Sequence, residues 1–281
     1  MGANPHKKLN LATRMRCVLN RFLKGTCALA FVLFALGSAK AADEDFKGFY
    51  VGANAGGAFG RPRVDTSPSF SPVGYFNSTS TPAITNASNQ TIDTNGFTAG
   101  GTAGYNFQFE SVVVGLEADY GAMNLSGSAT TGPVQYPCCP PTPTSPNNFT
   151  VVQTAKTSWV FTLRPRVGVV FGRFLLYGTA GAAIINVKYT ALITDTFAAA
   201  HESAAIDETR PGWAAGGGGE YHFAHHLSIK GEYLWTDFGV ASIPTSGLTV
   251  GTPPVPVTAN IFTHTVNMRA PLLRTGINFR F

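Results

Sequence analysis

The residues best suited to catalysis lie in the C-terminal third of the sequence. His201, Glu202, Asp207 and His264 combine imidazole and carboxylate groups, which transfer protons in many hydrolytic sites. Such a site also needs a nucleophile within hydrogen-bond reach of its base. No serine has the context of a nucleophile elbow, and nothing in the sequence fixes the geometry of the four residues. We therefore expect no catalytic residue, and an enzyme is the less favoured hypothesis.

Cofactor and metal sites are also weakly indicated. His222, His225 and His226 fall at a predicted tight turn, and two of them are adjacent, a spacing that suits metal coordination poorly. A solvated turn is therefore favoured over weak zinc or haem binding. The run "GGGG" at 216–219 has no helix start after it, so it indicates close packing within a strand and not a nucleotide loop. We expect no cofactor and no bound metal.

The start of the chain has the pattern of an export signal. Residues 1–41 hold seven Lys and Arg and no acidic residue, and the apolar run "GTCALAFVLFALGSAKA" follows from residue 25. A basic start, a short apolar run and the small residues Ala39 and Ala41 predict a secretory signal peptide that is cleaved after Ala41. The run is short for a membrane-spanning helix. Whether translation begins at Met1 or Met15 is left open.

The expected mature chain, residues 42–281, has a different charge balance. It carries 13 Lys and Arg against 15 Asp and Glu, so the basic pI of about 9.1 reflects the signal peptide. Nucleic acid is therefore not an expected partner. Export places the adjacent Cys138 and Cys139 in an oxidising compartment. A vicinal bridge, a link to another chain and a pair of free thiols are all open for them.

The mature chain alternates with the period of a β-strand. In "FTLRPRVGVVFGRFLLYG", residues 161–178, apolar residues alternate with Thr162, Arg164 and Arg166, so one face is apolar and the other polar. Strands are predicted at 47–60, 94–107, 111–124, 157–171, 173–189, 210–223, 226–239 and 267–281, and no helix is predicted. Short turns are expected near 108–111, 171–174 and 223–226, and long polar loops at about 61–93, 125–156, 190–209 and 240–266.

These elements predict an all-β fold, an eight-stranded antiparallel up-and-down barrel. The three short turns would lie at one end and the four long loops at the other. Such a sheet has to hide its edge strands, and closure into a barrel hides them completely.

The two faces of the strands indicate which solvent surrounds the barrel. One parity collects ten charges, namely Glu117, Asp119, Arg164, Arg166, Lys188, Glu220, Lys230, Glu232, Arg274 and Arg280. The other carries aromatic pairs ten or twelve residues apart, namely Phe49 and Phe59, Phe97 and Phe107, Trp213 and Phe223, Trp159 and Phe171, and Tyr177 and Tyr189. Ten tilted residues climb roughly 25 Å, the height of the apolar band of an outer-membrane barrel. We therefore expect lipid outside and an ion-pair network filling the lumen.

Five segments in order resemble the small outer-membrane β-barrels of the Omp25/Omp31 and opacity-protein type, often labelled outer membrane immunogenic or porin-like proteins. The segments are "GFYVGANAGGAFG", "GFTAGGTAGYNFQFESVVVGLEADYG", "TLRPRVGVVFGRFLLYGTAGAAI", "GWAAGGGGEYHFAHHLSIKGEYLWTDFG" and "LLRTGINFRF". The resemblance implies a place in the outer membrane of a Gram-negative bacterium, transmembrane strands through 42–281 and extracellular loops opposite periplasmic turns. It implies contact with outer-membrane lipid and lipopolysaccharide. The terminal Phe281 is similar to the signal that hands such chains to the barrel-assembly machinery, with periplasmic chaperones as further partners.

The sequence departs from the family pattern at one position, and the resemblance leaves more than one function open. Pro165 stands where the family more usually has a small residue, and we expect a bulge or one lost hydrogen bond there. The favoured function is a structural barrel with a filled lumen that supports the envelope and displays its loops to a host or the environment, with an unidentified loop ligand. The alternative is a narrow porin-like channel. An outer-membrane enzyme or a haem-binding surface protein is less favoured.

Overall fold

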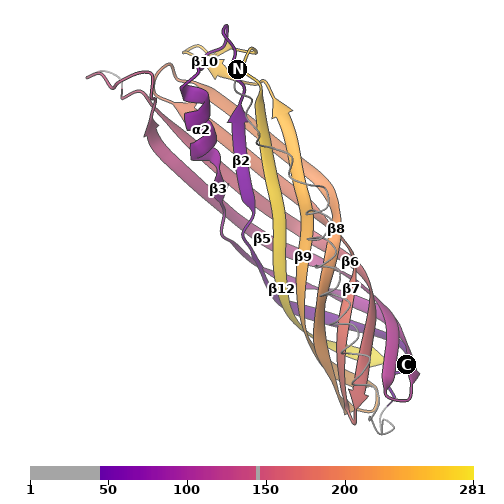
Figure 1. Ribbon diagram of the computed structural model, residues 1–281. Coiled ribbons are helices and arrows are strands. Elements are labelled where there is room, and N and C mark those ends of the chain that lie inside the picture. Colours follow the sequence, from indigo (N-terminus) through magenta and orange to yellow (C-terminus); the bar gives the residue numbers. More distant parts are fainter. Residues whose placement is uncertain (1–44, 144–145) are drawn as a thin grey trace, which may run out of the picture.

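Eight long antiparallel strands form a closed ring in the computed structural model, which describes residues 45–143 and 146–281 (Figure 1). The strands are β1 (Gly48–Gly60), β4 (Thr94–Phe109), β5 (Val112–Gln135), β6 (Asn148–Phe171), β7 (Phe174–Asp195), β8 (His201–Ala224), β9 (Leu227–Thr245) and β12 (Phe262–Arg280). Each pairs with the next along the chain, and β12 closes the ring by pairing with β1. The predicted all-β antiparallel ring is confirmed. The predicted cleavage positions Ala39 and Ala41 lie outside the described residues.

The strands are longer than the sequence pattern predicts, and the loops are correspondingly shorter. The β5–β6 hairpin continues to Gln135 and Asn148, so most of the expected loop at 125–156 is paired strand. Between β7 and β8 only residues 196–200 lie outside the two strands, not 190–209. These segments are rich in Thr, Ser and Ala, so they lack the apolar face that marks a strand in lipid, but Thr and Val still favour the extended backbone.

The expected loop at 61–93 contains regular structure. Strand β2 (Arg63–Pro68) continues β1 along β12, and β3 (Gln90–Thr91) pairs with β2. Helix α2 (Ser80–Ser88) packs against β2 and buries Ile84 completely (Figure 1). The prediction of no helix was therefore wrong here. The short strands β10 (Thr249–Val250) and β11 (Val255–Pro256) form a small hairpin within 240–266. No helix in the described part of the chain is long and apolar enough to cross a membrane.

The outer surface of the barrel changes character along its length. Near the end with the short turns, large apolar side chains are exposed, among them Phe49, Phe107, Val114, Leu116, Val167, Phe171, Leu176, Ile229 and Ile277. Towards the other end the strands expose charged side chains, including Lys156, Lys188 and Asp207. The first zone is suited to lipid and the second to water.

The interior is filled by five successive layers of side chains. The floor near the short turns is the apolar cluster of Phe46, Val113, Val170, Leu175 and Tyr177. The charged residues follow, and above them lies an apolar layer that includes Met123, Leu125, Ile185, Val187, Tyr189, Leu234, Phe238, Val266, Met268 and Leu272. A polar cluster around His264 comes next, and an aromatic cap that includes Phe76, Tyr136, Phe149 and Phe262 closes the far end.

The apolar layer explains an error of one residue in β7. Tyr177, Ile185 and Tyr189, predicted to face lipid, are at most 4% exposed and point inward, whereas Lys188, predicted to be lumenal, has 52% of its side chain exposed. Because side chains alternate along a strand, one wrong assignment inverts the whole strand. At Ile185, Lys188 and Tyr189 the pattern failed because β7 has left the lipid zone, and where the outside is water apolar side chains turn inward and charged ones outward. Tyr177 lies lower on β7 and turns inward as part of the apolar floor.

Pro165 has the local effect expected of a residue without an N–H. The β6–β7 ladder lacks the pairs of Arg164 and Pro165, although Leu163 pairs with Ala182 and Arg166 with Thr179 in one continuous register. A lost hydrogen bond, and not a bulge, therefore accommodates the proline. The Thr179 hydroxyl donates to the Pro165 carbonyl at 2.8 Å.

A closed ring of this length should resist detergent. We expect the mature protein, folded in detergent, to migrate faster on a denaturing gel when unheated than after boiling, because the intact barrel is compact and binds less detergent. Equal mobility before and after boiling would contradict the closed ring.

Candidate functional site

The charged layer brings together nine of the ten residues that the alternation placed in the lumen. They are Glu117 and Asp119 on β5, Arg164 and Arg166 on β6, Glu220 on β8, Lys230 and Glu232 on β9, and Arg274 and Arg280 on β12. None is more than 5% exposed. Lys188 is the exception, and it forms an exposed 3.0 Å ion pair with Asp207 on the outer surface.

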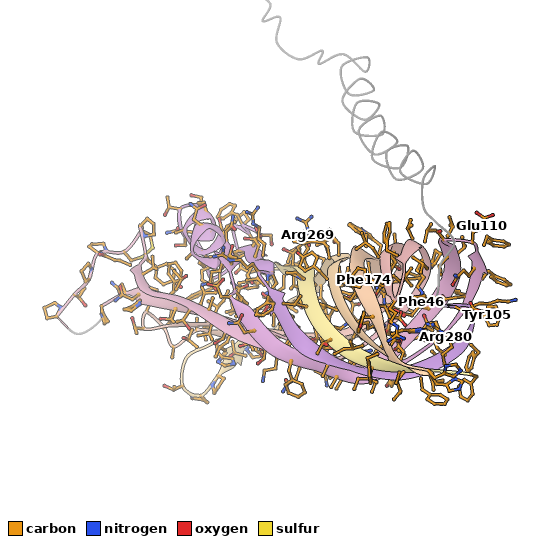
Figure 2. The ribbon with its side chains drawn as sticks, turned by 90° about the horizontal axis from the view of Figure 1, so that it is seen from below. Phe46, Tyr105, Glu110, Phe174, Arg269 and Arg280 are labelled. Carbon is orange, nitrogen blue, oxygen red and sulfur yellow. A yellow bond between two sulfur atoms is a disulfide. The ribbon has the colours of Figure 1, made fainter. Side chains whose placement is uncertain are left out.

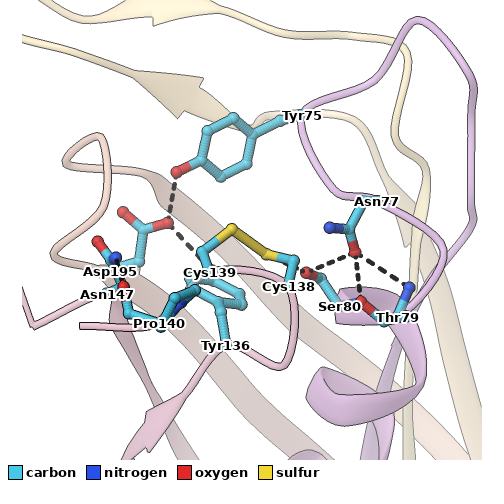
Figure 3. Close-up of a disulfide and its surroundings, with 10 residues drawn as sticks. All are labelled: Tyr75, Asn77, Thr79, Ser80, Tyr136, Cys138, Cys139, Pro140, Asn147 and Asp195. Atoms are coloured by element: carbon cyan, nitrogen blue, oxygen red, sulfur yellow. Dashed lines mark hydrogen bonds between the residues drawn. A yellow bond between two sulfur atoms is a disulfide. The ribbon is translucent and has the colours of Figure 1, made fainter. Parts of the chain in front are cut away.

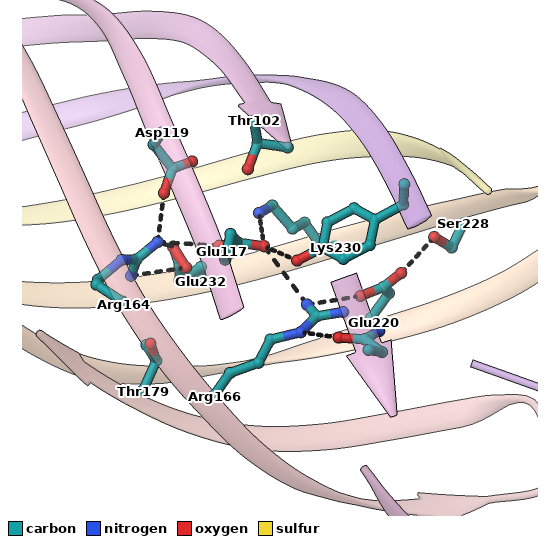
Figure 4. A network of polar contacts seen from close by, with 12 residues as sticks. Thr102, Glu117, Asp119, Arg164, Arg166, Thr179, Glu220, Ser228, Lys230 and Glu232 are labelled. Carbon is teal, nitrogen blue, oxygen red and sulfur yellow. Dashed lines mark hydrogen bonds and ion pairs between the residues drawn. The ribbon is translucent and has the colours of Figure 1, made fainter. Parts of the chain in front are cut away.

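Arg164 is the most enclosed member and contacts three carboxylates from two strands. Its Nη2 lies 2.5 Å from Asp119 and 3.0 Å from Glu117, and its Nη1 lies 3.1 Å from Glu232 (Figure 4). Arg274 approaches the same acids from β12, at 2.7 Å from Glu232 and 3.5 Å from Asp119. Opposite charges therefore alternate around this half of the layer, as buried charge requires.

Glu117 joins this group to a second one. Its carboxylate accepts from Lys230 at 2.9 Å and lies 3.4 Å from Arg166 Nη1, while the Tyr50 hydroxyl donates to it at 2.8 Å. Arg166 also reaches Glu220 at 3.2 Å (Figure 4). Glu220 in turn binds Arg280 at 3.0 Å. The nine charges thus form one connected network across the lumen.

His222 belongs to the edge of this network, and this corrects the prediction of a solvated turn for it. The His222 Nε2 atom lies 2.6 Å from Arg280 Nη1, and its ring stacks on Phe46 at 4.2 Å (Figure 2 labels Phe46 and Arg280 at this end). His225 and His226 are exposed at the turn, as expected. No group of three His, Cys, Asp or Glu that could hold a metal ion occurs among residues 45–143 and 146–281.

The charges also have uncharged partners, of which Tyr50 was missed by sequence reasoning. Tyr50 is completely buried and lies under the Arg166 guanidinium, 4.6 Å from it, and Asn106 Oδ1 accepts from Arg166 Nε at 2.9 Å. The signal was present, because strict alternation through "GFYVGANAG" places Tyr50 on the inner face. A Cβ on Gly104 would come within 2.3 Å of the Tyr50 hydroxyl, so this inward glycine makes room for a tyrosine.

A second polar cluster lies nearer the loop end, beyond the lipid zone. His264 is completely buried, and its two ring nitrogens lie 2.8 Å from the Thr66 hydroxyl and 3.0 Å from the Thr245 hydroxyl. Thr245 donates to Glu202, whose carboxylate is 4.0 Å from His264 Nε2. The structure thus brings together two of the four possible catalytic residues, while His201 and Asp207 are exposed elsewhere.

Burial sets the protonation of this cluster. It lowers the pKa of His264 to about 4 and raises the pKa of Glu202, because a charged form loses its hydration inside the barrel. His264 is therefore neutral at pH 7 and can both donate to one threonine and accept from the other. Both threonine hydroxyls already have partners, so the cluster contains no free nucleophile for a hydrolytic step.

A shallow hollow of about 70 Å³ marks the tip of the loop end. It is lined by Tyr75, Phe76, Asn77, Ser80, Tyr136, Cys138, Cys139 and Phe197. The two cysteines are bonded to each other, so the vicinal bridge is the state found among the three left open. The hydroxyls of Tyr75 and Tyr136 both donate to Asp195, at 2.6 Å and 3.0 Å (Figure 3). Three separate chain segments therefore meet here.

A closed antiparallel ring with an apolar belt outside and paired charges inside defines the class of outer-membrane β-barrel proteins. The chain belongs to this class: residues 28–268 match the model of the outer membrane protein beta-barrel domain family. The apolar belt is therefore the surface that faces the lipid of the outer membrane.

Curated relatives narrow the family to the Omp25/Omp31 type. The chain is 28% identical over 236 residues to the 31 kDa outer-membrane immunogenic proteins of Brucella melitensis and Brucella suis, which covers 83% of this chain and 83% of each relative. It is 30% identical over 136 residues to a 22 kDa outer membrane protein of Rhizobium leguminosarum, covering 48% and 49% of the two chains.

The solved structures that align with the chain have lower sequence identity. The outer membrane protease OmpT of Escherichia coli aligns with a TM-score of 0.39 and 10% identity, covering 83% of this chain and 96% of OmpT. Ail, the attachment invasion locus protein of Yersinia pestis, aligns with a TM-score of 0.32 and 11% identity, covering 83% and 99%.

Loss of Arg164 should destabilise the barrel far more than loss of Lys188. Arg164→Ala would leave buried carboxylates without their cation, which costs about 3–5 kcal/mol of unfolding free energy. Lys188→Ala removes one exposed ion pair, worth at most about 1 kcal/mol. Urea unfolding in detergent, followed by the heat-dependent gel shift, measures both. Equal losses for the two variants would contradict the network.

Acid should weaken the His264 cluster. The pKa of the folded state lies below that of the unfolded chain, so the unfolded chain takes up the proton first and stability falls as the pH drops from about 6.5 towards 4. Between pH 7 and pH 5 this residue should cost ~2 kcal/mol of unfolding free energy. Glu202 acts in the opposite sense, so His264→Gln should lose less stability on acidification than the unsubstituted protein. An unchanged acid response in His264→Gln would contradict the assignment.

Proposed function

We propose that the protein is a structural outer-membrane barrel with a side-chain-filled lumen, which contributes to envelope integrity and displays its loop end to the surroundings. The burial of the nine lumenal charges carries the proposal. A water-filled path through the charged layer would leave these side chains accessible to water, whereas none of them is more than 5% exposed.

The layers on both sides of the network support the same function. The floor around Phe46 lies below the charges, and the apolar layer around Met123 and Leu272 lies above them. Ions crossing the barrel would have to pass both apolar layers as well as a network whose charges already neutralise one another. Eight strands enclose a lumen that side chains can fill, whereas aqueous channels belong to barrels of 16 or more strands.

A narrow porin-like channel is the second candidate, and one observation favours it. Arg166 Nη2, Arg274 Nε and both amide atoms of Asn278 are buried without a hydrogen-bond partner among the described residues. Groups of this kind commonly hold internal water. Waters at these positions would be separated from one another by the charged network. If the network rearranged, they would connect into an interrupted path for ions through the lumen.

Exposed side chains and a structured hollow at the loop end support the display function and the binding of an unidentified ligand there. Phe197 and Val73 are 51% and 84% exposed near the tip, although they lie beyond the lipid zone. The aromatic hollow beside the Cys138–Cys139 bridge gives this end a defined shape. An external partner could therefore meet a structured surface there.

The exposure of Phe281 supports the proposal that the barrel-assembly machinery and periplasmic chaperones are partners. Phe281 is 69% exposed, and its ring packs against Phe49 and Phe279 at 5.6 Å and 5.1 Å. A terminal aromatic residue that stays accessible suits the barrel-assembly machinery and its chaperones.

Current recordings separate the two candidates. We expect the mature protein in a planar bilayer to show no stable conductance steps, because the lumen is filled. The variant Glu232→Ala, which removes a carboxylate shared by Arg164 and Arg274, should show more frequent brief openings if its barrel forms. Stable, repeatable steps from the unsubstituted protein would favour the channel.

A further inference from the structure

Three arginines gather on the outer wall directly above the lipid zone. Arg63 on β2 pairs across the sheet with Asn267 on β12 and with Thr91 on β3. Arg61 lies two residues earlier along the same edge, and Arg269 two residues later on β12. Together these five residues line an open hollow of about 410 Å³ (Figure 2 shows Arg269 on the outside of the barrel). The hollow lies where β1 ends and β2 begins, so the wall is interrupted there.

The arginines keep donors free for an additional anion. Arg61 uses its Nε for Asp93 at 2.8 Å, and Arg269 uses its Nε for Asp237 at 2.9 Å. No other hydrogen bond of these two guanidinium groups is found within the described residues, so their Nη atoms point into water. Arg63 has no ion pair in the described part of the chain. A guanidinium fork of this kind matches the oxygens of a phosphate group.

Asn267 adds an unpartnered acceptor to the wall of the hollow. Its Oδ1 atom is buried without a hydrogen-bond partner. A carbonyl oxygen accepts from a hydroxyl or an amide N–H. A sugar hydroxyl and a protonated phosphate oxygen are both donors of this kind, so the binding test below distinguishes a phosphorylated sugar from inorganic phosphate.

An apolar cradle lies immediately below the arginines, on β1, β4 and β12. Gly57 pairs with Phe97 on β4 and with Leu273 on β12. The ring of Phe59 folds over Gly57, where a Cβ would come within 2.8 Å of it. Phe59, Phe97 and Leu273 are 49%, 55% and 59% exposed. Acyl chains would meet these side chains while the attached headgroup reached the arginines.

From this arrangement we propose that Arg61, Arg63 and Arg269 bind the phosphorylated sugar headgroup of an acylated glycolipid in the outer leaflet, that is, the lipid A part of lipopolysaccharide. The short turns and the C-terminus mark the periplasmic end of the family, so this site lies at the outer leaflet. The proposal depends on the location in the outer membrane and holds whether or not the lumen conducts.

A second basic group on the barrel provides a matched control. Lys156 and Lys188 pair across β6 and β7, and Arg210 lies on β8. Arg210 donates to the Val240 carbonyl on β9, and Lys188 forms an ion pair with Asp207 on β8, so this group lies on neighbouring strands outside the hollow. Replacing these three residues removes the same charge from the outer wall and leaves the hollow and the apolar cradle unchanged.

The test compares two triple variants of the mature protein in detergent. One is Arg61→Gln/Arg63→Gln/Arg269→Gln and the other is Lys156→Gln/Lys188→Gln/Arg210→Gln, and the heat-dependent gel shift verifies that both fold. The probe is purified bis-phosphorylated lipid A, with binding measured by titration or native mass spectrometry. We expect at least a tenfold loss of affinity in the arginine variant and less than a twofold change in the control.

Two further probes identify the source of the phosphate. Dephosphorylated lipid A should bind the unsubstituted protein at least tenfold more weakly and be insensitive to the arginine substitutions. Inorganic phosphate should not displace lipid A at equal concentration. Equal affinity of both triple variants for lipid A would overturn the site, and displacement by inorganic phosphate alone would reassign it to a free anion.

Discussion

Closure of the hydrogen-bonded ring is the constraint on which the rest of the structure depends. In lipid no water can satisfy an exposed strand edge, so β12 pairs with β1 and the wall has a fixed circumference. Eight strands then enclose a space that side chains have to fill. Polar side chains can occupy it only if each charge finds an opposite one, and Arg164, surrounded by three carboxylates, shows how completely this is achieved.

The surroundings of the barrel wall change from lipid to water along its length. The side chains on the inner face change in the opposite sense, from charged to apolar. Where the outside is lipid, outward residues such as Leu163 are apolar and inward residues such as Arg164 are charged. Beyond the lipid the outside is water, so Lys188 turns outward and Val187 inward. The same ring thus behaves as a membrane barrel in its lower part and as a soluble barrel in its upper part. The arginines at 61, 63 and 269 stand at the boundary, where both a charged headgroup and acyl chains are within reach.

The buried network fixes one arrangement of the strands more than it adds stability. Replacing paired charges by well-packed apolar residues is often neutral, whereas removing one partner is costly. Glu117 contacts groups from β1, β6 and β9 at once, so a slip of any of these strands would leave charge unpaired. The vicinal bridge and helix α2 order the far end by a different means, since both pack on the aromatic cap.

The sequence by itself determined the ring of eight strands and nine of the ten lumenal charges, because alternation of apolar and charged residues survives in any strand that separates lipid from a lumen. It also placed Phe59 and Phe97 on the outside. It could not determine where the strands end, because Thr- and Ser-rich segments form strands or loops according to their neighbours. Only the tertiary structure decided the inward parity of Tyr177 and Tyr189, the burial of His222 and the meeting of His264 with Glu202. Each of these depends on contacts between residues far apart in the chain, and a local pattern carries no information about such contacts.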